Sequence, residues 1–169
     1  MPTTYGSLNA ANTYFNTRLH SNLWFNESST ERTNALYKAT SIVEMLNYKG
    51  CKATVYTALA ADADATQATL RAAEAAQELE FPRDDDTSVP TIIEYATYEI
   101  AFALLDGIDP DLELENLAVV SQGYAGVKTT YNRGQQPIEH LINGVPSATA
   151  WRMLRPFLRS DGGPKLSRI

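Results

Sequence analysis

The sequence contains one cysteine, Cys51, and no apolar run long enough to cross a membrane. A single cysteine excludes a disulfide within the chain and is typical of a protein that folds in a reducing cytoplasm. The longest uninterrupted apolar run, Ile100 to Leu105, has six residues, whereas a membrane span needs about 20. The first eight residues lack the basic flank and apolar stretch of a signal peptide. We therefore expect a protein without a membrane partner that folds in the cytoplasm.

The sequence also lacks the usual motifs of metal and phosphate sites. The two histidines, His20 and His140, are isolated, and no HExxH motif or cysteine pair is present, so no metal site is expected. Asp84 to Asp86 could collect a hard cation, but they lack the spacing of a calcium loop, which favours a solvated loop. Gly162-Gly163 follows an expected helix instead of opening one, which is the wrong order for a phosphate cradle. No cofactor is expected.

Nothing in the sequence indicates catalysis. Cys51 lies close to Lys49 and Lys52, but no base that could activate it as a nucleophile is identifiable, so a structural cysteine is the simpler interpretation. Glu94 and Glu99 are five residues apart on one expected helix, which directs them to different sides. Glu99 is expected to form an ion pair with Arg83 or another cation. We expect no catalytic residues and a protein that is not an enzyme.

Charge is distributed very unevenly along the chain. Residues 1–118 carry 7 Lys and Arg against 18 Asp and Glu, a formal −11, whereas residues 119–169 carry 7 against 2, a formal +5. The last basic residues follow Asp161-Gly-Gly-Pro164, a sequence that blocks a helix because glycine costs backbone entropy and proline lacks a donor. This pattern indicates an acidic body with a basic arm, which is either a frayed terminus or a docking peptide.

Hydrophobic periodicity predicts a mainly α fold, a small bundle of four to five helices with one β-hairpin and an extended C-terminal arm. Ser7 is a candidate N-cap for the first helix, and Ser28 and Glu31 form a capping box for a helix that ends near Lys49-Gly50. Residues 51–65 fit either a helix or a loop. The expected elements are helices over 66–80, about 90–106 (the central helix) and 146–158, and a hairpin around 117–132. The expected domain is 1–158, and the arm is 159–169.

The hairpin carries aromatic and basic side chains close together. Tyr124, Lys128, Tyr131 and Arg133 lie on or beside its strands, and proteins that bind single strands stack bases on aromatic side chains above a basic groove. Aromatic residues on a half-buried strand more often serve packing, so both interpretations stay open, with packing favoured.

Three parts of the sequence together resemble a known family. Residues 4–15 (TYGSLNAANTYF), 35–42 (ALYKATSI) and the pair 77–83 (QELEFPR) and 89–101 (VPTIIEYATYEIA) are similar, in this order, to segments of head–tail adaptors of tailed bacteriophages. These are also called connector or head-completion proteins, and some carry the label DnaT-like single-stranded DNA-binding protein. The resemblance covers about residues 4–158.

The resemblance implies a structural virion protein at the head–tail interface, made in the cytoplasm of the host bacterium. It implies a homo-oligomeric ring, typically of 12 copies, that joins the portal protein to a tail tube or nozzle protein. Double-stranded DNA would pass through the channel without sequence-specific binding during ejection. The resemblance suggests two sets of contact residues, the portal-docking residues Arg159, Lys165, Leu166, Arg168 and Ile169 in the arm, and the subunit or tail contacts Tyr124, Lys128 and Tyr131.

An alternative function is that of a single-stranded DNA-binding replication accessory protein. It predicts salt-sensitive binding to oligonucleotides through Lys128, Tyr131 and Arg133. The acidic net charge of −6 counts against it, because nucleic-acid binding depends on neutralising phosphates.

Overall fold

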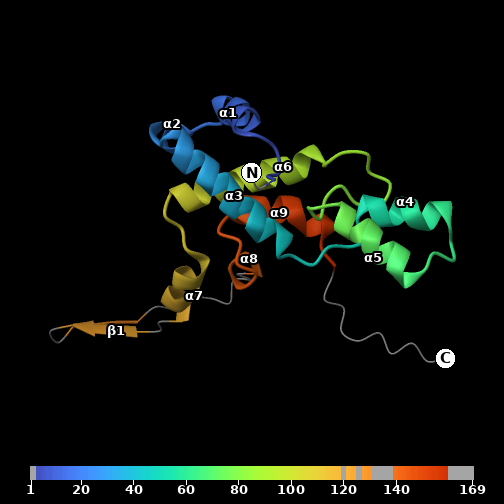
Figure 1. Cartoon of the computed structure of the whole chain (residues 1–169). Coiled ribbons are helices and arrows are strands. Elements are labelled where there is room, and N and C mark those ends of the chain that lie inside the picture. The colour runs from blue at the N-terminus through green and yellow to red at the C-terminus, as the bar shows by residue number, and fades with distance from the viewer. Residues whose placement is uncertain (1–2, 119–120, 125–126, 131–138, 160–169) are drawn as a thin grey trace.

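A computed structural model describes residues 3–118, 121–124, 127–130 and 139–159. This part of the chain is mainly helical (Figure 1). Its α-helices are α1 (Leu8–Asn16), α2 (Asn22–Asn26), α3 (Ser29–Glu44), α4 (Ala53–Ala61), α5 (Gln67–Ala76), α6 (Thr91–Leu105), α7 (Pro110–Ala118), α8 (Glu139–Ile142) and α9 (Ala148–Leu154), and a 3-10 helix follows at Arg155–Phe157. Within the described residues no helix is both long and apolar enough to span a bilayer.

Helix α6 lies at the centre of the core, packed against α3 and α9 (Figure 1). Eight of its 15 residues are buried, more than one face of a helix can supply, so neighbours must cover it on several sides. Ile93 and Ile100 of α6 contact a cluster that includes Leu36 of α3 and Leu154 of α9. The predicted central helix is therefore confirmed. Ile92 of the same helix is 36% exposed.

Helices α1 and α2 cover one side of this core. Ser7 accepts a hydrogen bond from the backbone of the first turn of α1, which confirms it as the N-cap. Phe15 and Trp24 are fully buried and stack with their ring centroids 4.5 Å apart. Residues 22–26 form the short helix α2. Phe25 on this helix is 41% exposed, so it stays outside the core that Trp24 enters.

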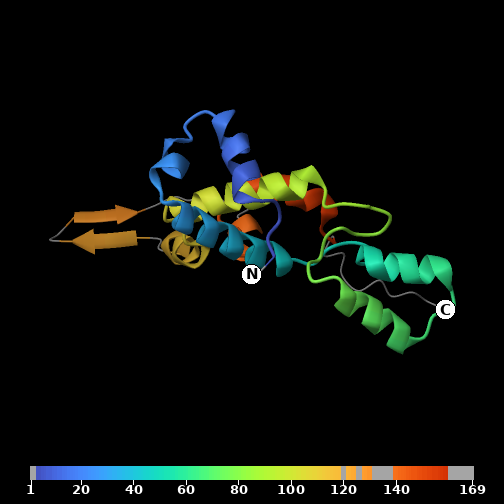
Figure 2. The same cartoon turned by 45° about the horizontal axis from the view of Figure 1, so that its top comes forward.

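Helices α4 and α5 form a helical hairpin that projects from the body (Figures 1 and 2). Neither helix has a buried residue, as expected for an element at the edge of the bundle. Gln77 joins the base of the hairpin, because its side chain donates to the carbonyls of Leu79 and Pro82 and accepts from the N–H of Thr54. The ambiguous region 51–65 thus contains a helix, and Thr66 caps the next one.

Helix α3 ends at Glu44, several residues before the expected stop at Lys49-Gly50. The following residues turn into the core, where Leu46 and Tyr48 are buried. The capping box of Ser28 and Glu31 at the other end of α3 is confirmed. Burial of the connecting segment therefore terminates the helix before the glycine does.

The expected small bundle of four to five helices with one β-hairpin around 117–132 is wrong, although the mainly α class is confirmed. The described residues contain nine α-helices, and α7 still continues at residues 117–118, where the hairpin was expected to begin. Strands β1 (Ser121–Tyr124) and β2 (Val127–Thr130) pair antiparallel and project away from the helices (Figure 2). The described core consists of residues from the helices and from the segments that connect them, such as Tyr48 and Phe81.

Candidate functional site

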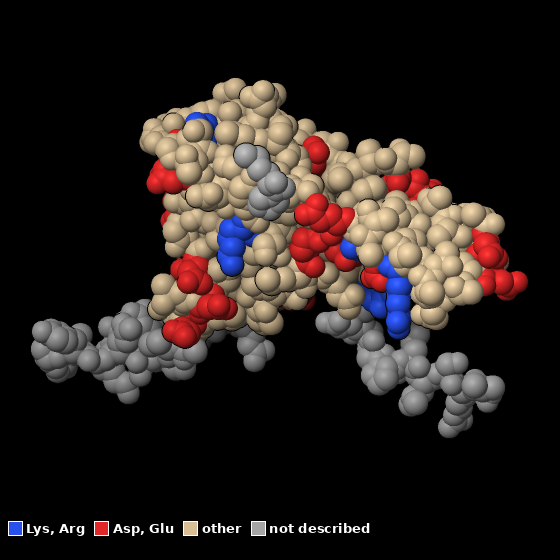
Figure 3. Space-filling view, in the orientation of Figure 1, with Lys and Arg blue, Asp and Glu red and all other residues tan. Residues whose placement is uncertain are grey.

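Among the charged side chains on the face that Figure 3 shows, acidic ones outnumber basic ones, with one acidic group at the junction between the body and the α4–α5 hairpin. Several basic side chains form ion pairs with acidic residues. Among the described residues Arg18 pairs with Glu99, and Lys52 and Arg83 both pair with Glu80. The expected ion pair of Glu99 therefore forms with Arg18, not with Arg83. The basic residues that remain outside ion pairs are the ones that a polyanion could reach.

Three such residues line one groove, which we call the basic groove. It has a volume of about 570 Å³ and lies between the segment after α3 and the helices α8 and α9. Its lining residues are Leu46, Asn47, Lys49, Glu139, Ile142, Asn143, Trp151, Arg155, Leu158 and Arg159. It thus combines three cations, one tryptophan and one carboxylate among the described residues.

Backbone hydrogen bonds hold the two walls of the basic groove together. The N–H of Lys49 donates to the carbonyl of Phe157, and the N–H of Arg159 donates to the carbonyl of Asn47, both at 2.9 Å. A bridge between Tyr48 and Leu158 lies between these two bonds. Segments far apart in the sequence are thereby fixed side by side, so the cations they carry are preorganised.

Helix α9 sets the direction of the side chains on its wall. Ser147 caps its N-terminus by accepting from the N–H of Ala150 at 3.2 Å, and the buried Leu154 anchors it to the core. Trp151 and Arg155 are four residues apart, and Arg155 keeps helical backbone angles. Residues at this spacing are neighbours on one helix face. The indole and the guanidinium therefore both lie along the groove.

The three cations of the groove have few partners inside the protein. Lys49, Arg155 and Arg159 are exposed, and no ion pair joins any of them to an acidic residue in the described part of the chain. The Lys49 Nζ donates to the carbonyl of Pro156 at 3.0 Å, which leaves further donors free. Glu139 is the only carboxylate among the described lining residues. The groove therefore carries a positive charge that no ion pair within the described residues neutralises.

Trp151 is the one aromatic residue of the groove among those described. It is partly buried and packs against the core. Its ring belongs to no aromatic pair of the described residues, unlike that of Trp24, which stacks on Phe15 and donates from Nε1 to Asn12 at 2.8 Å. Trp24 is thus part of the aromatic core, whereas the ring of Trp151 has no aromatic partner among the described residues.

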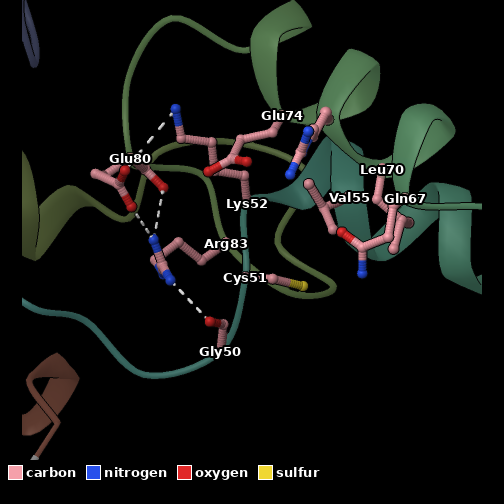
Figure 4. Close-up of a pocket in the computed structure, with 10 residues that line it drawn as sticks. Gly50, Cys51, Lys52, Val55, Gln67, Leu70, Glu74, Glu80 and Arg83 are labelled. Carbon is pink, nitrogen blue, oxygen red and sulfur yellow. Dashed lines mark hydrogen bonds and ion pairs between the residues drawn. The ribbon is translucent and has the colours of Figure 1, made fainter.

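A second hollow, of about 300 Å³, lies at the base of the α4–α5 hairpin and also contains basic residues (Figure 4). Here Arg83 donates from Nε and Nη2 to the carbonyls of Lys49 and Gly50, each at 2.9 Å, and its Nη1 pairs with Glu80. The Lys52 amino group lies 3.8 Å from the same carboxylate. These cations hold the hairpin base together, so they are less available to a ligand than those of the basic groove.

Two other groups considered from the sequence have no sign of activation. Burial, reinforced by the Asp84 carboxylate, raises the pKa of the Cys51 thiol, which opposes formation of a thiolate. Burial also lowers the pKa of His140. Within the described residues no three His, Cys, Asp or Glu side chains form a group that could hold a metal ion.

The structure brings only one of the site residues expected from the sequence into the basic groove. That residue is Arg159. The backbones of Tyr124 and Lys128 belong to β1 and β2, and Lys165, Leu166, Arg168, Ile169 and Tyr131 lie outside the described residues. The sequence analysis missed Lys49, Trp151 and Arg155 as site residues. Only the four-residue spacing of Trp151 and Arg155 on one helix could have indicated a shared surface.

Comparison with known proteins corrects the expected family. No curated protein and no solved structure matches the chain. A family model described as "Putative DnaT-like ssDNA binding protein" matches residues 3–169. This match gives no support to the resemblance to bacteriophage head–tail adaptors, which is therefore wrong, and the ring, portal and tail contacts implied by it lose their basis. Because the match covers nearly the whole sequence, the chain belongs to the DnaT-like family.

Proposed function

We propose that this protein binds single-stranded DNA, with its phosphates along the basic groove. The observation that carries the proposal is that Lys49, Arg155 and Arg159 converge on one groove without acidic partners among the described residues. Membership of a family described as DnaT-like ssDNA binding supports the same function. The alternative weighed from the sequence is thus kept, but its binding residues change.

The electrostatics of the chain determine what kind of binding to expect. A protein that neutralises phosphates of a single strand releases counterions, and the logarithm of its binding constant falls with the logarithm of the salt concentration at a slope of about −0.7 per phosphate. Three contacts give a slope of about −2, so affinity falls roughly 20-fold between 50 and 200 mM salt. The acidic body, with a formal −11 over residues 1–118, opposes binding elsewhere on the surface. Binding is therefore expected to be sensitive to salt and to depend most on the groove.

A titration of a fluorescein-labelled oligothymidylate, followed by anisotropy at low salt, tests the proposal. The wild-type chain is expected to bind, and the double variant Arg155→Ala with Arg159→Ala is expected to bind at least tenfold more weakly, because charge-assisted contacts to two phosphates are lost. Lys38→Ala is the matched control, since Lys38 is also exposed but lies on α3 away from the basic groove. Absence of binding by the wild type at low salt would refute the proposed function.

The same titration separates the groove from the residues first expected to bind. The double variant Lys128→Ala with Arg133→Ala removes the basic residues on and after the second strand. The proposal predicts a smaller loss of affinity for this variant than for the groove variant. If the order is reversed, the protein binds DNA but the basic groove is not the main interface.

A further inference from the structure

We infer that Trp151 is the base-contacting residue of the basic groove, and that an unpaired base stacks on its indole while adjacent phosphates contact Arg155 and Arg159. This inference rests on the proposed function and assigns one side chain a role beyond charge. A groove lined only by cations would bind phosphates without regard to the bases. An aromatic face adds a contact that requires an unstacked base, which single strands offer at low cost.

The first support is the state of the Trp151 ring. Trp151 lines the groove and packs against the core, but in the described part of the chain its ring pairs with no other aromatic ring. Aromatic pairs elsewhere in the protein are numerous and include those of Phe15 with Trp24 and of Tyr48 with Phe81. Trp151 is therefore a large π surface at the edge of the core that has no aromatic partner among the described residues.

The second support is the placement of the ring relative to the cations. Trp151 and Arg155 are one helical turn apart, at a spacing that puts Cβ atoms roughly 5–6 Å from each other. Lys49 stands on the facing wall, which is fixed by the backbone bonds from Lys49 to Phe157 and from Arg159 to Asn47. A nucleotide can thus place its base on the indole and its phosphate on a guanidinium without a rearrangement of the backbone.

The third support is the rigidity of this site. Helix α9 packs against α6 through the buried Ala150 and Leu154 on either side of Trp151. Packing restricts the indole rotamer before a ligand arrives, which reduces the entropy lost on binding. The remaining lining residues include Leu46, Ile142 and Leu158, whose apolar side chains offer further contacts for a base.

The test combines tryptophan emission with anisotropy on the full chain. The probes are a labelled oligothymidylate and an oligonucleotide of the same length in which abasic sites replace the bases. The variants are Trp151→Leu, which keeps apolar bulk but removes the π face, and Trp151→Phe, which keeps an aromatic ring. Circular dichroism establishes that each variant is folded.

Stacking on an aromatic residue contributes enough that its removal weakens binding roughly tenfold. We expect oligothymidylate to quench the emission of the wild type at the concentrations that raise anisotropy. Trp151→Leu should lose this quenching and bind about tenfold more weakly, whereas Trp151→Phe should recover most of the affinity. The abasic probe should bind the wild type and Trp151→Leu equally, because neither complex contains a stacked base.

The outcomes distinguish this inference from the function on which it rests. If oligothymidylate binds the wild type while emission is unchanged and Trp151→Leu binds equally well, the base-contacting role is wrong and the basic groove remains the proposed site. If Trp151→Leu weakens the abasic probe as much as oligothymidylate, Trp151 acts only through packing, and the inference is again overturned. If neither probe binds the wild type, the proposed function itself fails.

Discussion

Replacement of Arg18 by methionine should destabilise the protein more than replacement of its partner Glu99 by glutamine. Glu99 is only 4% exposed, and its carboxylate lies 3.0 Å from the Arg18 guanidinium, which is 32% exposed. The Tyr14 hydroxyl also donates to Glu99, at 2.7 Å. The two partners therefore differ in their access to water, and their removal should have unequal costs.

The magnitudes follow from what each variant leaves behind. Arg18→Met leaves the buried Glu99 carboxylate with a single donor, the Tyr14 hydroxyl. Breaking a fully buried ion pair costs about 3–5 kcal/mol. Because Arg18 is partly exposed, we expect a smaller loss of stability, of about 2–3 kcal/mol. The guanidinium also lies 4.3 Å from the ring centre of Phe102, a contact that adds about 0.5–1 kcal/mol. Glu99→Gln keeps an acceptor for Tyr14 and leaves Arg18 able to reach water, so it should cost about 1 kcal/mol.

Urea unfolding followed by circular dichroism measures these costs as changes in the free energy of unfolding. The double variant completes a cycle and should be less unstable than the sum of the single variants by about 1–2 kcal/mol, since the second replacement removes the charge that the first one left buried. A larger loss of stability in Glu99→Gln than in Arg18→Met would contradict this prediction. So would a double variant whose loss of stability equals the sum of the two single losses.

Three further predictions concern single groups. Asp84→Asn should accelerate the reaction of Cys51 with a disulfide reagent at pH 8, because the Asp84 carboxylate contributes to the raised pKa of the thiol; an unchanged rate would contradict this. Burial raises the pKa of Tyr98 to about 12, whereas an unfolded chain ionises tyrosine near pH 10. Stability should thus hold below pH 10 and fall from pH 10 towards 12, less steeply in Tyr98→Phe, as measured by urea unfolding across this range. Ser147→Ala removes the N-cap of α9 and should lower the free energy of unfolding by about 1 kcal/mol, whereas Thr149→Ala, an exposed site within the same helix, should have almost no effect in the same assay.

Local features of the fold could be predicted from the sequence. The capping box of Ser28 and Glu31 and the N-cap Ser7 depend on residues within three positions of one another, and both are present. The burial of α6 was readable from its apolar residues on nearly all sides. The two caps depend on residues that are neighbours along the chain, and the burial of α6 depends on its apolar composition. Both can be read from the local sequence.

Features set by contacts between distant segments could not be predicted in this way. The end of α3 was placed at Lys49-Gly50 from the glycine, but the helix ends at Glu44 because Leu46 and Tyr48 enter the core. Glu99 was expected to pair with Arg83 or another cation, but its partner is Arg18, which lies in the turn after α1 and is far from Glu99 in the sequence.

The candidate site illustrates the same limit. The sequence favoured Lys128 and Tyr131, where basic and aromatic residues are close together, and the C-terminal arm, where basic and apolar residues alternate. Lys49 and Arg155 are far apart in the chain, and only the bonds between their backbone segments make them neighbours. The basic groove thus forms by tertiary packing, and no local sequence pattern predicts it.

The salt dependence of DNA binding tests whether the three cations of the basic groove contact the phosphates. The dissociation constant of the wild-type chain for a labelled oligothymidylate is measured by anisotropy between 50 and 200 mM salt, alongside Arg155→Ala, Arg159→Ala and the control Lys38→Ala. The basic groove predicts a slope of about −2 for the wild type if its three cations make the contacts, and a slope reduced by about 0.7 for each arginine variant but not for the control. An equal salt slope in all four proteins would show that the groove arginines do not contact the phosphates.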